Sequence, residues 1–296
     1  MHEPYPIHCV KRGEEGYPPA LLPYKGMPEK LYYRGNLPDP QKPSAAVVGA
    51  RMCSAYGRIQ AFRYAKVLSE AGVQIISGLA AGIDSEGHKG ALEGKAPTFA
   101  VLGGGVDVIY PKSNRSLYMR ILRSGGGILS ETETGVAPKP FSFPARNRII
   151  SGLSDVILIV EAKEKSGSLI TAEYGLEQGK SVYAVPGAVN DELSRGCHKL
   201  IYDGAGIAYD PEILLMEWGI RTEIKEDVTG NNEQKKELGL AEDLNLLYSN
   251  LGSRPASLDS LIRRTGLPAG KAATSLVELC LMGLARETSR HYYVRL

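Results

Sequence analysis

The chain has 296 residues, of which 43% are hydrophobic and 23% are charged, a balance typical of a soluble globular protein with room for two domains. The formal net charge is only +2, which excludes a strong positive field over the whole molecule and leaves a local basic patch as the form that a nucleic-acid site would take. Four widely spaced cysteines form no CxxC pair, and no apolar run has the length of a signal peptide or of a membrane span. These features predict a cytoplasmic protein with no metal site and no membrane segment.

Residues 1–43 are rich in proline and tyrosine, as in YPPALLPYKGMPEKLYYRGNLP. This composition interrupts helices and strands at short intervals. We therefore expect an N-terminal arm that packs on the main body and has little regular structure.

From Ser44 onward, short apolar runs alternate with helical patterns. The runs are SAAVVGA, VQIISG, PTFAVLG, GGILSE, VILIVEA, SVYAVPG and GIAY, and the helix candidates include SAYGRIQAFRYAKVLSEAG and SLITAEYGLEQGK. Continuously apolar strands that alternate with helices indicate a parallel sheet covered on both faces. The predicted fold class is α/β, with a doubly wound, Rossmann-like and mostly parallel sheet over residues 44–219.

The C-terminal part of the chain changes character twice. RTEIKEDVTGNNEQKKELG has no apolar periodicity and predicts a linker at 220–239. LAEDLNLLYSNLG, SLDSLIRRTG and PAGKAATSLVELCLMG then read as three amphipathic helices and LARETSRHYYVRL as a hairpin, which together predict a small winged-helix domain at 240–296. Its third helix carries one cation, Lys271, and few base-reading side chains, so a protein contact and weak nucleic-acid binding both remain open.

Ligands of an open parallel sheet bind beyond the carboxyl ends of its strands, so the residues that follow each strand are the candidates for a site. Gly49 and Arg51 follow the first strand, Ser77 and Gly78 close the second, and residues 166–168 follow the fifth. Glycines allow a close backbone approach and helix N-termini favour anions, so phosphate is the expected ligand group. The need to turn from a strand into a helix is enough to explain the glycines of any single loop. Several such loops at one edge of the sheet favour a binding site.

Known nucleotide motifs and catalytic patterns are near matches only. GARMCSAYG lacks the GxGxxG of nicotinamide enzymes, and GLEQGKS lies between a helix and a strand, whereas a P-loop lies between a strand and a helix. Acidic and histidine side chains near the expected edge show no hydrolase or metal-ligand spacing; they are Glu131, Glu161, Glu173, Asp84 and His88. We expect His88 on a helix surface or at a helix end, and predict no catalytic residue, no cofactor and no metal.

The motifs taken together resemble one family. SGLAAGID, FPARNRIISGLSD, SGSLITAEYGLEQGK, VPG and GCHKLIYDGA occur in the order and spacing typical of the DprA/Smf DNA-processing proteins, and the resemblance covers nearly the whole chain. Two positions depart from the pattern: His198 stands where asparagine is usual, and Ala50 stands where serine is common. The resemblance implies a protein that is not an enzyme, that binds single-stranded DNA in natural transformation and loads the recombinase RecA onto it, and that dimerises through its Rossmann-like domain.

The resemblance also implies a set of DNA-binding residues. The basic members are Arg51, Arg146 and Arg148, with Lys199 as a weaker one, and the backbone and hydroxyl donors are Gly49, Ser77, Gly78, Ser166, Gly167 and Ser168. Contacts to phosphate carry no sequence information, so binding is expected to tolerate any sequence and to weaken strongly with salt.

Arg146 and Arg148 are two residues apart, so on a helix their side chains diverge by about 200°. We expect one to face the strand and the other to pair with a carboxylate, either Glu131 or Glu161. Arg146 lies nearer the preceding loop and is the predicted DNA-facing residue. Asn147 between them is expected to hydrogen-bond the backbone of a neighbouring loop.

Three aromatic side chains near the edge, Tyr110, Phe141 and Phe143, are candidate stacking platforms, although core or loop packing is the favoured explanation for any one of them. The segment IYDGAGIAYDPEILLMEW is a candidate dimer interface and also reads as an edge strand with a closing helix.

Two other functions remain open. The chain is also similar to Rossmann-like phosphoribohydrolases, in which a turn like the one at 166–168 leads to residues such as Thr171 and Glu173, although FPARNRIISGLS is foreign to those enzymes. An adaptor that binds the recombinase without DNA is the third possibility, and the basic loop edge argues against it.

Overall fold

The computed structural model describes residues 5–220, 241–252 and 255–295. The chain divides into two compact units, Met1–Glu223 and Ile224–Leu296, each with its own hydrophobic core. The linker expected at 220–239 lies outside the described residues except for Ile220.

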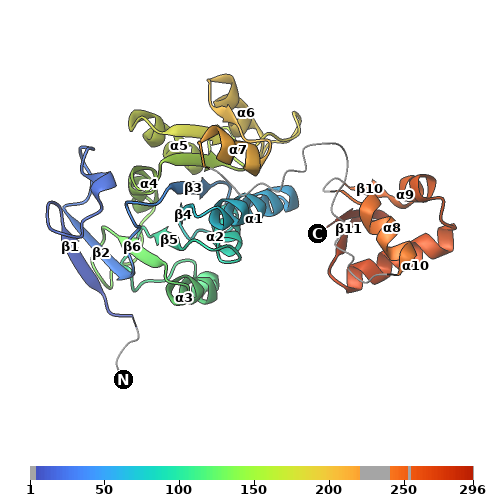
Figure 1. The fold of residues 1–296 in the computed structure, drawn as a ribbon, viewed down its shortest axis with the longest axis horizontal. Helices are drawn as coiled ribbons and strands as arrows, with labels where there is room; N and C mark the ends of the chain where they lie inside the picture. The colour runs from blue at the N-terminus through green and yellow to red at the C-terminus, as the bar shows by residue number, and fades with distance from the viewer. Residues whose placement is uncertain (1–4, 221–240, 253–254, 296) are drawn as a thin grey trace. The chain divides into compact units, whose positions relative to one another are not determined.

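One sheet organises the described part of the first unit, with the strand order β1-β2-β6-β5-β4-β3-β7-β8-β9 (Figure 1). The strands are β1 (His8–Lys11), β2 (Lys30–Gly35), β3 (Ser44–Val48), β4 (Gln74–Ser77), β5 (Thr98–Val101), β6 (Gly127–Ser130), β7 (Val156–Ile159), β8 (Ser181–Ala184) and β9 (Gly206–Ile207). All neighbours from β3 to β9 pair in parallel. These strands coincide with the seven apolar runs, so the prediction of a mostly parallel sheet is confirmed.

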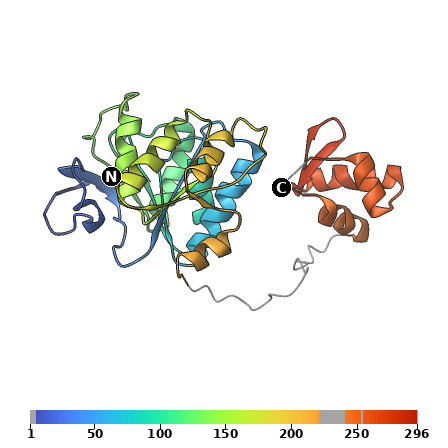
Figure 2. The ribbon, with the colours of Figure 1, turned by 90° about the horizontal axis from the view of Figure 1, so that it is seen from above.

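Helices cover both faces of this sheet, as a doubly wound fold requires (Figure 2). One face carries α1 (Ala55–Glu70), α2 (Ile83–Ala91), α3 (Arg115–Arg123) and α7 (Pro211–Glu217), and the other carries α4 (Ser142–Gly152), α5 (Gly167–Glu177), α6 (Arg195–Tyr202) and the short η1 (Pro19–Leu21). In β3, Ala45 and Val47 pack in the core on the face covered by α1, and Ala46 and Val48 pack in the core on the face covered by α4. Successive side chains of a strand point to opposite faces, which is why the buried strands read as continuous apolar runs.

The order of the strands determines where this sheet has its ligand-binding crevice. From β3 the chain adds β4, β5 and β6 on one side, then returns to place β7, β8 and β9 on the other side of β3. The loops after β3 and β7 therefore lead in opposite directions, and a doubly wound sheet binds its ligands where this reversal occurs.

The N-terminal arm has more regular structure than its composition predicts. β1 pairs antiparallel with β2, and β2 pairs antiparallel with β6, so the arm extends the sheet. Its side chains Leu21, Met27 and Leu31 are buried in the core that also holds Ile149 and Ile150 of α4. The arm packs on the body as expected, but the expectation of little regular structure was wrong. The pairing partner of β2 lies about a hundred residues away, beyond the reach of a local pattern.

The second unit contains α8 (Glu242–Asn250), α9 (Leu258–Thr265) and α10 (Ala269–Leu281), with an antiparallel sheet of β10 (Ala256–Ser257), β12 (Tyr292–Arg295) and β11 (Ala285–Ser289). Leu247, Leu261 and Leu276 bring the three helices into one buried core with Tyr293 of β12. The predicted winged-helix fold is confirmed. Among the helices in the described ranges, none is both long and apolar enough to cross a membrane.

Candidate nucleic-acid interface

Two adjoining pockets open at the carboxyl edge of the parallel strands. The switch-point pocket, about 450 Å³, lies over the ends of β3 and β7 and is lined by Val48, Gly49 and residues 166–168 among others. The β5 pocket, about 100 Å³, lies over the ends of β4 and β5 and is lined by Gly78, residues 102–104 and Tyr110 among others. Both pockets are lined by Arg51, Ala80, Phe143 and Arg146.

Seven of the ten residues proposed for DNA binding line these pockets; they are Gly49, Arg51, Gly78, Arg146, Ser166, Gly167 and Ser168. The other three do not. Ser77 is fully buried, and its hydroxyl donates to the carbonyl of Val47 at 2.7 Å. Lys199 is exposed on α6. Arg148 lies on the far side of α4 from Arg146.

Arg146 is a buried cation in the wall between the two pockets. Its Nη1 donates to the carbonyl oxygen of Gly78 at 2.6 Å and to that of Val101, and its Nη2 lies 3.9 Å from Oδ2 of Asp84. Burial lowers the pKa of Arg146 to about 10, and Asp84 opposes that shift, so the guanidinium stays charged at neutral pH. Arg146 therefore holds the ends of β4 and β5 together and gives the pockets a fixed positive wall.

Asp84 completes this buried unit from the first turn of α2. Its carboxylate accepts hydrogen bonds from the backbone N–H groups of Gly78 at 3.1 Å and Ala80 at 3.4 Å. Burial raises the pKa of Asp84, while Arg146 acts against that rise. A side chain at position 78 would collide with the guanidinium of Arg146, so a glycine is required there. SGLAAGID and PARNR, far apart in the sequence, thus form one structural unit.

Arg148 points away from the pockets and pairs with a carboxylate. Its Nη2 donates to both carboxylate oxygens of Glu131, at 2.7 and 2.8 Å. The expected pairing of one arginine with an acid is confirmed, with Glu131 as the partner. Glu161, the other option, instead accepts from the backbone N–H and hydroxyl of Ser54 at the start of α1.

The N-terminus of α5 borders the switch-point pocket. Ser166 caps this helix, since its Oγ accepts from the backbone N–H of Ser168 at 3.4 Å and lies 2.8 Å from the Ser168 hydroxyl. Asn147 donates to the carbonyl of Gly167 at 3.1 Å, which confirms its expected bond to a neighbouring loop and fixes α4 against α5. The positive end of the helix dipole and the serine hydroxyls at this helix start suit an anionic ligand.

An aromatic and cationic ledge lies at the mouth of the β5 pocket. The guanidinium carbon of Arg51 lies 4.6 Å from the ring centre of Phe143, and the Tyr110 ring centre lies 5.6 Å from the same ring. Tyr110 is 51% exposed, and Phe141, which lines neither pocket, is 70% exposed. Two of the three proposed stacking residues therefore belong to the pocket.

Several lining residues gave no signal in the sequence. They are Leu102, Val108, Pro138 and Pro140 among others. Small and apolar side chains suggest no chemistry by themselves, and only their position beside Arg146 and Phe143 makes them part of a site.

His88 is not at a helix surface or end, as the sequence suggested, but fully buried in α2. Its Nδ1 lies 2.7 Å from the hydroxyl of Thr98, which itself donates to the carbonyl of Ile75 at 2.8 Å. Because the hydroxyl proton is committed to Ile75, Nδ1 must carry the ring proton. Burial lowers the pKa of His88 to about 3, so this neutral ring is a core residue.

Comparisons with known proteins cover both units. The family model described as DNA recombination-mediator protein A matches residues 8–219, and the DprA winged helix domain matches residues 232–289. Protein Smf of Escherichia coli is 38% identical over 281 residues, which span 93% of this chain and 74% of that protein. DNA processing protein DprA of Streptococcus pneumoniae is 42% identical over 205 residues, which span 69% and 72% of the two chains.

Solved structures agree with these matches. The X-ray structure of DprA from Streptococcus pneumoniae superposes with a TM-score of 0.67 at 41% identity, over 73% of this chain and 75% of that one. DNA processing protein A from Helicobacter pylori, whose structure was described for its single-stranded DNA binding mode, gives a TM-score of 0.63 at 28% identity, over 72% and 95% of the two chains. With family models matched in both units and relatives aligned along most of its length, the chain belongs to the DprA/Smf family of DNA-processing proteins.

Proposed function

We propose that this protein binds single-stranded DNA without sequence preference across the two pockets, and loads RecA recombinase onto the strand in the cytoplasm during natural transformation. The observation that carries the proposal is the placement of Arg51 on the Phe143 ring, above the buried charge of Arg146. This arrangement offers positive charge and an aromatic face to the same ligand.

Phosphate contacts belong to the switch-point pocket. The pocket combines Arg51 with the capped start of α5 at 166–168 and with the bare backbone of Gly49. A Cβ at position 49 would lie 2.7 Å from Ile83 and 2.8 Å from the carbonyl oxygen of Glu161, so the loop can pass there only as glycine. Backbone, hydroxyl and guanidinium donors position a phosphate backbone but do not read bases, so the binding is expected to tolerate any sequence.

Base contacts belong to the rim of the β5 pocket. Phe143 and Tyr110 offer ring faces, and Met52 beside Arg51 is 87% exposed. The bases of a single strand have free faces that stack on such side chains, whereas the bases of a duplex are already stacked on one another. The rim therefore supports a preference for the single strand over the duplex.

Fluorescence anisotropy tests this proposal, with the purified protein and labelled single-stranded and duplex oligonucleotides of the same sequence across a salt series. We expect preferential binding of the single strand, similar affinity for unrelated sequences, and a logarithmic salt slope that shrinks by about 0.7 for each phosphate contact removed. Arg51→Ala should lower both the affinity and the slope. Equal affinity for the duplex, or a slope near zero, would contradict the proposal.

The recombinase step rests on family membership, because the matched family is described as a recombination mediator. RecA hydrolyses ATP when it is assembled on a single strand, so its ATPase activity reports loading. A substoichiometric amount of the protein should shorten the lag before RecA reaches its full rate on single-stranded DNA. The Arg51→Ala variant should shorten it less, and an unchanged lag with the wild type would refute the loading step.

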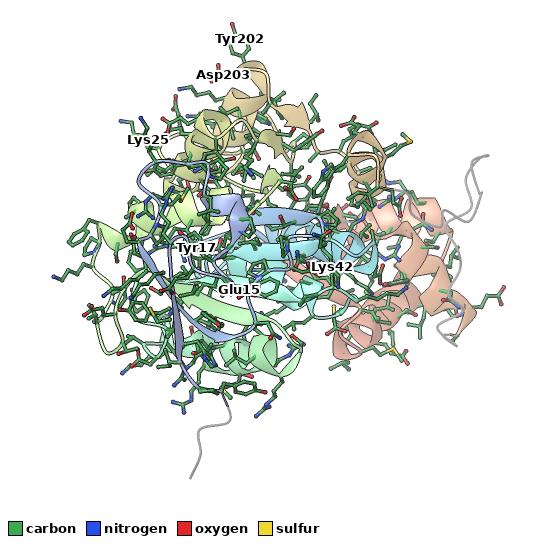
Figure 3. The ribbon with its side chains drawn as sticks, turned by 60° about the vertical axis from the view of Figure 1, so that its left-hand side comes forward. Glu15, Tyr17, Lys25, Lys42, Tyr202 and Asp203 are labelled. Atoms are coloured by element: carbon green, nitrogen blue, oxygen red, sulfur yellow. The ribbon has the colours of Figure 1, made fainter. Side chains whose placement is uncertain are left out.

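We also propose a homodimer through residues 201–218, the segment that runs from the end of α6 through α7. Tyr202, Ile207, Tyr209 and Met216 of this segment are between 50% and 90% exposed, a large apolar content for a free surface. Figure 3 shows Tyr202 and Asp203 projecting away from the body at the end of α6. Light scattering on Tyr209→Asp should show a monomer if the segment forms the interface, and a dimer unchanged by this charge would place the interface elsewhere.

A phosphoribohydrolase has less support from the geometry. Glu173, the acid that the similarity would need, is exposed and lines neither pocket. Among the described residues that line the pockets, Asp84 is the one carboxylate, and it is held by two backbone N–H groups and Arg146. Release of free base from a nucleoside monophosphate, followed by chromatography, would restore the enzymatic alternative.

A further inference from the structure

The helix α3 begins at the edge of the β5 pocket. Tyr110 and Pro111 line the pocket, and the short helix η2 (Lys112–Asn114) follows them directly and leads into α3. The side-chain amide of Asn114 donates to the carbonyl of Leu79 at 2.8 Å and lies 2.9 Å from the hydroxyl of Ser85. This bond fixes the start of α3 against the loop that contains the pocket residue Ala80.

The two sides of α3 differ in character. Leu117, Tyr118 and Ile121 are buried against the sheet in one core. The opposite side exposes Arg115, Arg120 and Arg123, and Lys112 is exposed just before the helix. No acidic residue occurs between positions 112 and 123, so this side of the helix carries only positive charge.

Two of these arginines have no acidic partner. Arg120 pairs with Glu93 at 3.4 Å, but within the described ranges no carboxylate lies within 4.0 Å of Arg115 or Arg123. The cations of α1, which covers the same face of the sheet, behave differently, because Arg63 pairs with Asp210 at 2.8 Å and Lys66 with Glu70 at 3.8 Å.

The position of Arg115 is also unfavourable for the helix itself. Arg115 is the first residue of α3, and the first turn contains no acidic side chain. The positive end of the helix dipole repels a cation there. Residues that break a local rule without compensation from the fold often serve a ligand.

We propose that the exposed face of α3, with Lys112, Arg115 and Arg123, binds the phosphates of the same DNA single strand where it leaves the β5 pocket. This inference rests on the proposed function and adds a second contact surface to it. The switch-point pocket lies at the ends of β3 and β7, the β5 pocket lies at the ends of β4 and β5, and α3 begins beside the β5 pocket. From there α3 packs against β5 and β6 and leads back over the sheet to the start of β6, so a strand that leaves the β5 pocket can follow the helix away from the edge (Figure 1).

The spacing of the cations fits an extended anion better than a single small one. Arg115 and Arg123 are eight residues apart on the exposed part of α3, which separates them by about 12 Å along the helix axis and about 80° around it. A strand presents a phosphate every few ångströms, about 3.4 Å in the stacked form, so more than one phosphate can face this length of helix.

The length of the DNA separates this inference from the proposed function. Anisotropy titrations use oligothymidylates of about 6 nucleotides, which fill only the pockets, and of about 30 nucleotides, which also reach α3. The test variant is the double substitution Arg115→Gln and Arg123→Gln. The control is Arg63→Gln with Lys66→Gln, which removes the same net charge from α1, away from the pockets.

We expect the α3 variant to bind the long oligonucleotide about tenfold more weakly, with a logarithmic salt slope lower by about 1.4, and to bind the short one as the wild type does. The α1 variant should match the wild type for both lengths. An unchanged affinity of the α3 variant for the long strand, or an equal loss in the α1 variant, would overturn the inference while leaving the pocket site intact. Failure of the wild type to bind either length would overturn the proposed function and this inference together.

Discussion

Arg146 combines two roles at the scale of single residues. Its guanidinium lines both pockets, yet its nitrogens already bond the carbonyls of Gly78 and Val101 and approach Asp84. Its contribution to the proposed DNA binding therefore passes through its charge and through the loops that it holds. Arg51, which is exposed and rests on Phe143, is free to contact a ligand directly.

The two arginines should consequently respond differently to substitution. Arg146→Ala leaves Asp84 and two carbonyls buried without their partner, and we expect a loss of about 3–5 kcal/mol in the free energy of unfolding together with weaker DNA binding. Arg51→Ala should weaken binding and leave the unfolding free energy nearly unchanged. Urea denaturation and anisotropy on the two variants check this, and a stable Arg146→Ala protein with unchanged affinity would contradict both roles.

His88 gives the protein a predictable acid sensitivity. Its pKa is about 3 in the folded protein and about 6.5 in the unfolded chain, so between these values the unfolded state binds more protons. The free energy of unfolding should therefore fall as the pH is lowered through this window, by up to about 1.4 kcal/mol per pH unit from this residue. His88→Gln should lose that component, so the difference in stability between wild type and variant should shrink from about pH 7 to about pH 4. Parallel stability curves would show that the ring is protonated in the folded state.

At the scale of elements, the site depends on pairs that no single element contains. Phe143 belongs to α4 and Tyr110 to the loop after β5, and their rings meet only because both lie beside the end of β5. Phe143→Ala should lower the affinity for a single strand about tenfold or more through the loss of stacking, and Phe143→Trp should preserve it. Phe141→Ala, which removes an equal ring from outside the pockets, should have a smaller effect; equal losses would mean that the pocket does not decide the stacking.

The elements also show how far local sequence patterns reach. The seven parallel strands follow from their apolar runs, and helices α1 and α5 follow from the helical patterns between them. β1 and β2 do not, because β1 has one buried side chain, Val10, and β2 is stabilised by its pairing with β6. A strand that depends on a distant partner carries little local signal.

At the scale of the whole molecule, the two units have separate cores. The buried cluster of the second unit runs along the chain from Leu244 to Tyr293. The described clusters of the first unit contain no residue beyond Ile220. All the pocket residues also precede Ile220. The chain should therefore unfold in two calorimetric transitions.

A protein that ends at Ile220 should keep the larger of these transitions and the affinity for a short single strand. Each core would then be shown to fold by itself, as their separation implies. A truncated protein without a cooperative transition, or with no affinity for DNA, would show that the winged-helix unit supports the first one.

Local sequence patterns and motifs were enough to predict the fold class, the winged helix and most of the candidate site. Continuous apolar runs report burial on both faces, and the position of a residue after such a run already places it at the ligand edge. The motif resemblance implies seven of the residues that line the pockets, and helical geometry alone places Arg146 and Arg148 on different sides of a helix.

The contacts that each of these residues makes could be known from the folded structure alone. In the folded protein, Arg146 is buried against Gly78, Val101 and Asp84, and Arg148 pairs with Glu131. Ser77 lies in the core, and the guanidinium of Arg51 packs on the ring of Phe143. These outcomes depend on contacts between residues tens of positions apart, which are fixed by strand order and packing. A local pattern records the environment that a side chain needs, whereas the identity of its neighbours is set by how the whole chain folds.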